Sequence, residues 1–66
     1  MAGQEVIFEF IRLGNSVKVT AVDPLTRIEV AIVGPAAADE ATLRQAALRK
    51  LDFVRRRRAR SGTPQD

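Results

Sequence analysis

The chain has 66 residues, of which 45% are apolar and 29% charged, and it contains neither Cys nor His. A chain of this size forms one small domain, and the missing residues exclude disulfides, thiolate metal sites and the commonest metal ligand. We therefore expect no metal and no cofactor, and self-association remains as a way to bury more apolar surface. No apolar run approaches the ~18 residues of a membrane span. The opening Met-Ala-Gly-Gln-Glu lacks the features of a signal peptide, so we expect a cytoplasmic protein.

The positive charge is concentrated in the last part of the chain. Residues 1–38 carry three basic and four acidic side chains, whereas residues 39–66 carry eight basic and four acidic ones. The two net charges, −1 and +4, sum to the +3 of the whole chain. An acidic partner, either a protein or a nucleic acid, is therefore expected to meet the C-terminal part.

Two alternating apolar runs predict a first β-hairpin. In residues 5–13, and again in residues 16–22, apolar side chains recur at every second position. The two residues between these runs begin with Gly14, which suits a type II′ turn because Gly accepts a positive φ. A two-residue loop places Phe10 opposite Val19, and both apolar sets then fall on the same face of the sheet.

A second turn is predicted at residues 23–26, where Asp-Pro-Leu-Thr has the composition of a type I turn. A four-residue loop pairs Val22 with Arg27 and places Val19 opposite Val30. The apolar faces agree again, so local and global signals support the same sheet. The predicted strands of this three-stranded antiparallel β-meander are residues 5–13, 16–22 and 27–33. The residues of its apolar face are Val6, Phe8, Phe10, Val17, Val19, Ala21, Ile28, Val30 and Ile32.

Residues 39–60 are predicted to form a single C-terminal helix. Asp39 is a good N-cap, and Glu40 complements the helix dipole. An apolar stripe on this helix covers the apolar face of the sheet, which gives an α+β fold with two layers. Residues 1–60 then form one βββα domain, and residues 61–66 a flexible tail. The stripe consists of Leu43, Ala46, Ala47, Leu48, Leu51, Phe53 and Val54.

A scattered pattern runs through the predicted sheet and helix: Phe10-Ile11, Gly14, Val17-Lys18-Val19, Ala21-Val22-Asp23, Thr26, Glu29-Val30, Ile32, Gly34-Pro35, Leu43, Ala47, Lys50-Leu51 and Phe53-Val54. This pattern resembles a family of short uncharacterised bacterial proteins. The resemblance covers most of residues 8–54, and it implies a compact domain of unknown function without catalytic residues. The family pattern has Gly after the turn Thr, where this chain has Arg27.

The densest charge lies at the C-terminal end of the predicted helix, where five of six residues are Arg. Such a cluster favours phosphate groups, because binding releases counterions and depends steeply on salt. Arginines in this position also satisfy the last helix carbonyls and complement the dipole. Two interpretations therefore stay open: a polyanion site, and a helix end that is either solvated or in contact with a protein partner. The residues concerned are Arg55, Arg56, Arg57, Arg58 and Arg60.

The second face of the sheet is predicted to be half apolar. Isolated surface aliphatics are common, but this patch is large for so small a domain and favours self-association into a homodimer. The first and third strands also lack a Pro or Lys guard in this prediction, so edge pairing is another route to a dimer. The residues of the face are Ile7, Ile11, Leu13, Val22, Ala31 and Val33.

Two carboxylates on this second face are the only candidates for catalysis. The predicted register places Glu9 and Glu29 on either side of Thr20, with Lys18 diagonal to both. A cross-strand ladder of ion pairs explains this arrangement, whereas acid–base catalysis needs a concave site that two layers scarcely provide. The sequence thus predicts no catalytic residue. It predicts a non-enzymatic interaction module, with a polyanion-binding accessory protein as the alternative.

Overall fold

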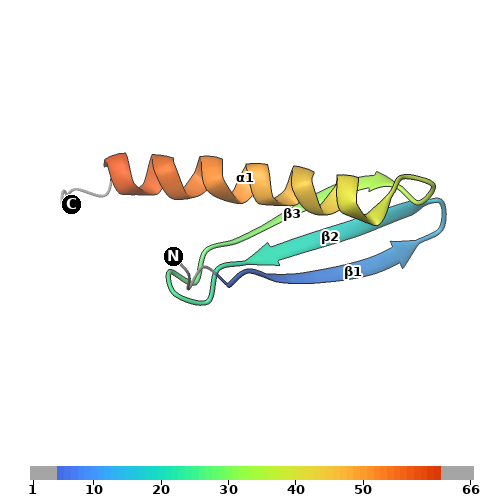
Figure 1. Cartoon of the computed structure of the whole chain (residues 1–66), viewed down its shortest axis with the longest axis horizontal. Helices are drawn as coiled ribbons and strands as arrows, with labels where there is room; N and C mark the ends of the chain where they lie inside the picture. The colour runs from blue at the N-terminus through green and yellow to red at the C-terminus, as the bar shows by residue number, and fades with distance from the viewer. Residues whose placement is uncertain (1–4, 62–66) are drawn as a thin grey trace.

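The computed structural model describes residues 5–61, with side chains described up to Ala59. One antiparallel sheet with strand order β1-β2-β3 is covered on one face by a single helix, α1 (Figure 1). This confirms the predicted α+β meander. The helix extends to Ser61, and residues 62–66 of the predicted tail lie outside the described part. The elements are β1 (Ile7–Leu13), β2 (Ser16–Val22), β3 (Glu29–Pro35) and α1 (Glu40–Ser61).

The β1–β2 hairpin has the predicted register. Phe10 lies opposite Val19, and Leu13 and Ser16 flank the two-residue turn. Gly14 has a φ of 64°, a left-handed value that a residue with a Cβ adopts only at a cost. The local sequence therefore sets both the turn and the pairing of these two strands.

The β2–β3 register differs from the prediction by two residues. Val22 pairs with Glu29 instead of Arg27, and Val19 lies opposite Ile32 instead of Val30. The reason is a loop of six residues, 23–28, where four were expected. A shift by two preserves the side-chain face, since successive side chains alternate. The apolar face was therefore assigned correctly although the pairing was wrong.

Backbone and side-chain hydrogen bonds close this longer loop. The N–H of Asp23 donates to the carbonyl of Ile28 (2.9 Å), and the N–H of Arg27 donates to the carbonyl of Asp23 (2.7 Å). Arg27 has a φ of 66°, which is the left-handed region that favours glycine. The Gly of the family pattern and Arg27 thus occupy a position where the backbone itself prefers Gly.

The helix begins where the chain turns back over the sheet. The N–H of Leu43 donates to the carbonyl of Asp39 (3.1 Å), which places Asp39 at the N-cap as predicted. Leu43 then packs directly on Gly34 of β3. A Cβ at Gly34 would lie 2.5 Å from Leu43 Cδ2, so the absence of a side chain allows this close approach.

The core lies between α1 and two of the three strands. The helix packs against β2 and β3, and no residue of β1 is fully buried. Phe8 and Phe10 are only half-buried. Phe53, which was predicted to widen the helix stripe, is 54% exposed, because two residues beyond Leu51 turn its side chain about 200° away from the sheet. The buried apolar residues are Val19, Ala21, Ile28, Val30, Leu43, Ala47 and Leu51.

The helix is longer than the sheet that it covers. Its C-terminal turns continue beyond the strands on the side of the β2–β3 loop (Figure 1). This overhang carries most of the arginine-rich segment, which begins at Arg55. Within residues 5–61, no helix is both long enough and apolar enough to cross a membrane.

Candidate functional site

The sheet face opposite α1 exposes large aliphatic side chains. Ile7, Ile11, Leu13 and Val33 each have between 41% and 66% of their surface exposed. Val22 and Ala31, the other two predicted members, are half-buried. We call these six residues the outer face. A strand leaves every second side chain on this side, and no element within the described residues covers them.

The shifted register rearranges the polar residues of the outer face. Thr20 lies between Glu9 and Ala31, and Glu29 lies opposite Val22 at the end of the strand. The predicted pair of carboxylates on either side of Thr20 is therefore wrong. Glu9, Lys18 and Glu29 are all exposed. These three side chains lie on an open surface that is mostly aliphatic.

Arg55 bonds to the scaffold and does not project freely into solvent. Its Nη1 donates to Asp23 Oδ2 at 2.8 Å, and its Nη2 donates to Asp52 Oδ1. Asp23 is only 5% exposed. Its other oxygen, Oδ1, accepts the N–H of Leu25 at 2.9 Å. Asp23 thus holds the β2–β3 loop with one oxygen and the helix with the other.

The contacts of Asp23 also change its acidity. The Arg55 guanidinium, together with the N–H of Leu25, holds the pKa of Asp23 below its ordinary value of 3.8, although burial opposes this shift. Asp23 and Asp52 in turn raise the pKa of Arg55. The three side chains are therefore a charged cluster that joins α1 to the sheet. The spacing of three residues on one helix indicates the Asp52–Arg55 pair. No local pattern in the sequence indicates the contact between Arg55 and Asp23, which are 32 residues apart.

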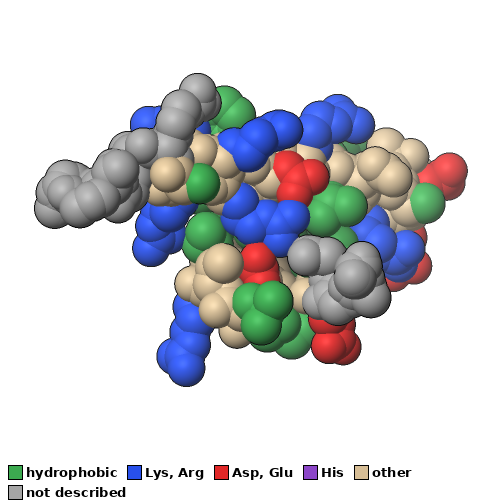
Figure 2. Space-filling view, turned by 60° about the vertical axis from the view of Figure 1, so that its left-hand side comes forward, with side chains coloured by type: hydrophobic (Ala, Val, Ile, Leu, Met, Phe, Trp, Pro, Cys, Tyr) green, Lys and Arg blue, Asp and Glu red, His purple; other side chains and the backbone are tan. Residues whose placement is uncertain are grey.

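The remaining arginines of the segment are more accessible. Arg56, Arg57 and Arg58 are exposed, and Figure 2 shows several Lys and Arg side chains at the surface of one face of the molecule. The guanidinium of Arg57 lies 5.7 Å from the centre of the Phe53 ring. Within residues 5–61, Arg56 and Arg58 make no ion pair or hydrogen bond. The side chain of Arg60, the fifth predicted contact, lies outside the described residues.

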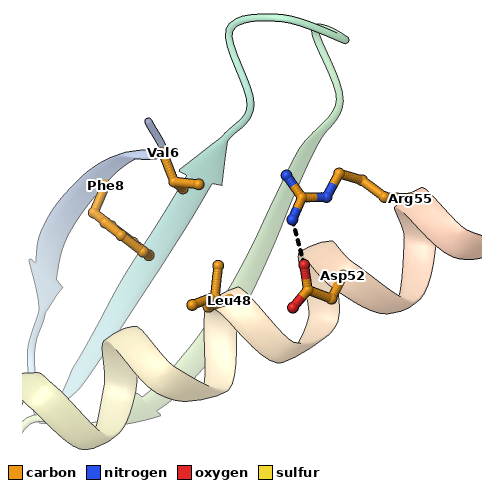
Figure 3. A pocket seen from close by; sticks show the side chains of 5 residues that line it. All are labelled: Val6, Phe8, Leu48, Asp52 and Arg55. Carbon is orange, nitrogen blue, oxygen red and sulfur yellow. Dashed lines mark hydrogen bonds and ion pairs between the residues drawn. The ribbon is translucent and has the colours of Figure 1, made fainter. Parts of the chain in front are cut away.

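A groove that the sequence did not reveal runs between β1 and α1. This open groove has a volume of about 450 Å³. Phe8 of β1, Val6 just before it and Leu48 of α1 line it, with Asp52 and Arg55 at one end (Figure 3). Farther along β1, the guanidinium of Arg44 lies 5.7 Å from the Phe8 ring centre and 5.9 Å from that of Phe10. The groove exists because the helix sits over β2 and β3 and leaves β1 partly uncovered.

The two edge strands differ in a way that corrects the prediction. Lys50 of α1 donates from Nζ to the carbonyl of Ala31 in β3 at 2.9 Å, and β3 ends in Pro35. Both devices block pairing along a strand edge. The expectation that the third strand has neither a Pro nor a Lys guard is therefore wrong. No Pro or Lys occurs in β1.

Among the described residues, no group of three or more acidic side chains is placed to hold a metal ion. The groove beside α1, the outer face and the arginine segment are the surface features of a two-layer α+β domain. The model of the family described as "Domain of unknown function (DUF6898)" matches residues 3–59, and the chain belongs to this family. This match confirms the resemblance to a domain of unknown function. No curated protein and no solved structure matches the chain.

Proposed function

We propose that this domain is a non-enzymatic interaction module that associates with itself into a homodimer. The observation that supports self-association is the outer face, where four large aliphatic side chains are at least 41% exposed. A patch of this kind on so small a domain is typical of an interaction site. Either this face or an edge strand supplies the contact, and both routes use residues of β1.

The open geometry of the carboxylates supports the non-enzymatic part of the proposal. Catalysis by acid–base groups needs a concave site that shields them from water. Glu9, Lys18 and Glu29 are exposed instead, and other residues line the groove between β1 and α1. We accordingly assign no catalytic role to any of these three side chains.

Sedimentation equilibrium across the micromolar range tests self-association. We expect a species of twice the 7.2 kDa chain mass that dissociates on dilution. An Ile11→Glu variant should weaken association at least about tenfold, because it places a charge in the middle of the exposed aliphatic patch. Leu25→Glu is the matched control, since Leu25 is also exposed but lies in the β2–β3 loop. A 7.2 kDa species at every concentration would contradict the proposal.

A second candidate function is binding of a polyanion, either nucleic acid or an acidic protein, by the arginine segment. Arg56 and Arg58 favour it, because they are exposed and their charges are not paired within residues 5–61. Each phosphate contact should add about −0.9 to the slope of log K against log salt on duplex DNA.

The test compares the wild-type chain with Arg56→Ala/Arg58→Ala in a salt titration of DNA binding. We expect the slope of log K against log salt to be less negative by about two for the double variant. Arg49→Ala is the control, since Arg49 is exposed on the same helix but away from the segment. Equal slopes for all three proteins, or no complex at low salt, would exclude DNA as the polyanion that this segment binds.

A further inference from the structure

One edge of the sheet is blocked by the protein itself. In β3, the carbonyl of Ala31 accepts a hydrogen bond from the ammonium group of Lys50 at 2.9 Å. Pro35, at the end of the same strand, has no N–H to offer. Another strand that approached this edge would have to displace Lys50 from Ala31. It would also find no N–H donor at Pro35, the last residue of β3.

Along the other edge, that of β1, no strand pairs within residues 5–61. Residues that face each other in an antiparallel pair alternate between hydrogen-bonded and non-hydrogen-bonded pairs. Leu13 and Ser16 flank a two-residue turn and form a hydrogen-bonded pair, so Phe8, Phe10 and Arg12 direct their N–H and C=O groups away from β2. The same alternation places the Ala31 carbonyl on the outer edge of β3, which is where Lys50 reaches it.

The inner face of the sheet, which is the face toward α1, is also incompletely covered at β1. Phe8 and Phe10 are half-buried although all their neighbours on β2 in the same rows are fully buried. The groove of about 450 Å³ lies directly over this strand. Among the described residues, β1 thus has no backbone partner along one edge and incomplete cover on its apolar side.

We propose that a second copy of this chain pairs antiparallel along β1. The result is a six-stranded sheet that carries both helices on one face. This inference rests on the proposed self-association and specifies the surface that performs it. A second copy fits because a strand that pairs with itself around a two-fold axis presents the same groups on both sides.

The register follows from strand length and charge. With Phe10 opposite the Phe10 of the second copy, all seven residues of β1 are paired. About six backbone hydrogen bonds form, two for each of three hydrogen-bonded pairs. A shift that centres the axis on Glu9 would place two like charges directly opposite each other and leave part of the strand unpaired. Centring on Phe10 places Glu9 opposite Ile11 instead.

This register also accounts for exposed side chains on both faces. On the inner face, the two Phe10 rings meet and Arg12 of one copy lies opposite Phe8 of the other, which are favourable aromatic and cation–π arrangements. On the outer face, Ile7 lies opposite Leu13. Both of these side chains are more than half exposed in one copy alone.

Cysteine cross-linking tests the strand pairing, because the natural chain has no Cys. In the proposed register, Glu9 and the Ile11 of the second copy form a non-hydrogen-bonded pair with a Cα–Cα distance of about 4.5 Å, suitable for a disulfide. The test variant is Glu9→Cys/Ile11→Cys. Its matched control is Ala31→Cys/Val33→Cys, which occupies the same two rows of the outer face on the opposite edge.

After mild oxidation of the full chain, we expect a covalent dimer as the main product of the β1 variant and at least about tenfold less from the β3 variant. Equal cross-linking of both variants would overturn pairing along β1 and favour association through the outer face. An uncross-linked β1 variant, with wild-type protein that sediments as a dimer, would also overturn it. Wild-type protein that sediments at 7.2 kDa throughout would overturn both this inference and self-association.

Discussion

The two connections of the sheet are built on different principles. The β1–β2 connection has two residues, and a single left-handed glycine, Gly14, shapes it. The β2–β3 connection has six residues, and side chains shape it. Asp23 Oδ1 accepts the N–H of Leu25, and Thr26 Oγ1 accepts the N–H of Ile28 at 3.3 Å. The first turn accepts one side-chain hydrogen bond, from Arg12 Nε to the Gly14 carbonyl at 2.7 Å, but its shape depends on the backbone conformation of Gly14. The second turn depends on side-chain acceptors within the loop itself.

This difference extends to the helix. Asp23 Oδ2 accepts a hydrogen bond from Arg55, which lies 32 residues later in the chain. The longer loop is thus stabilised by a tertiary side-chain contact. The long-range contact of the first turn is between backbone groups instead, because the Asn15 carbonyl accepts the N–H of Ala36 at 2.8 Å. A turn that needs a partner from another element can be weakened from a distance.

Asp23→Ala should have the largest effect, because it removes a nearly buried acceptor from both the loop and the helix. We expect the midpoint of thermal unfolding to fall on the order of 10 °C. Circular dichroism at 222 nm measures it. Asp52→Ala is the control, since it removes only the more exposed partner of Arg55. Equal losses for the two variants would show that the Asp23 contacts do not hold the loop.

Gly14→Ala should destabilise the first turn through the backbone alone. A Cβ at this position meets no atom within 4 Å, so the cost is conformational and amounts to about 1 kcal/mol in urea unfolding. Asn15→Ala, in the same turn, should change stability by less than about 0.5 kcal/mol. If both substitutions are neutral, the turn tolerates a side chain at positive φ and the proposed contrast between the connections fails.

Acid should weaken the second connection selectively. Asp23 has a lower pKa in the folded state than its ordinary value of 3.8. Its carboxylate therefore contributes stability that is fully present above pH 3.8 and is lost as the pH falls through the lower pKa of the folded state. Urea midpoints measured between about pH 5 and pH 2 should therefore decline more steeply for the wild type than for Asp23→Asn. Parallel curves for the two proteins would remove Asp23 from the acid response.

Arg27→Gly should give the smallest change, and it should be stabilising. Gly relieves the left-handed strain at φ 66° but adds freedom to the unfolded chain, so we expect a net gain of about 0.5 kcal/mol. Arg27→Ala keeps a Cβ at the same φ and controls for loss of the long side chain. A loss of stability in the Gly variant, with no change in the Ala variant, would contradict a strained turn.

The outer face could be predicted from the sequence, whereas the state of the arginine segment could not. Alternation at period two assigns Ile7, Ile11 and Val33 to one side of the sheet whatever the exact pairing. The position of Arg55 depends on where the β2–β3 loop lies relative to the last helical turns. No local pattern connects it to Asp23, and composition alone groups it with the exposed arginines.

The sequence by itself determined the three strands, the faces of the sheet, the first hairpin register and the extent of the helix. These properties follow from side-chain alternation, one glycine turn and helical periodicity, which act over neighbouring residues. The tertiary structure alone decided the β2–β3 register and the difference between the two sheet edges. Each of these depends on where α1 lies across the sheet, because Arg55 and Lys50 reach the loop and β3 only from that position.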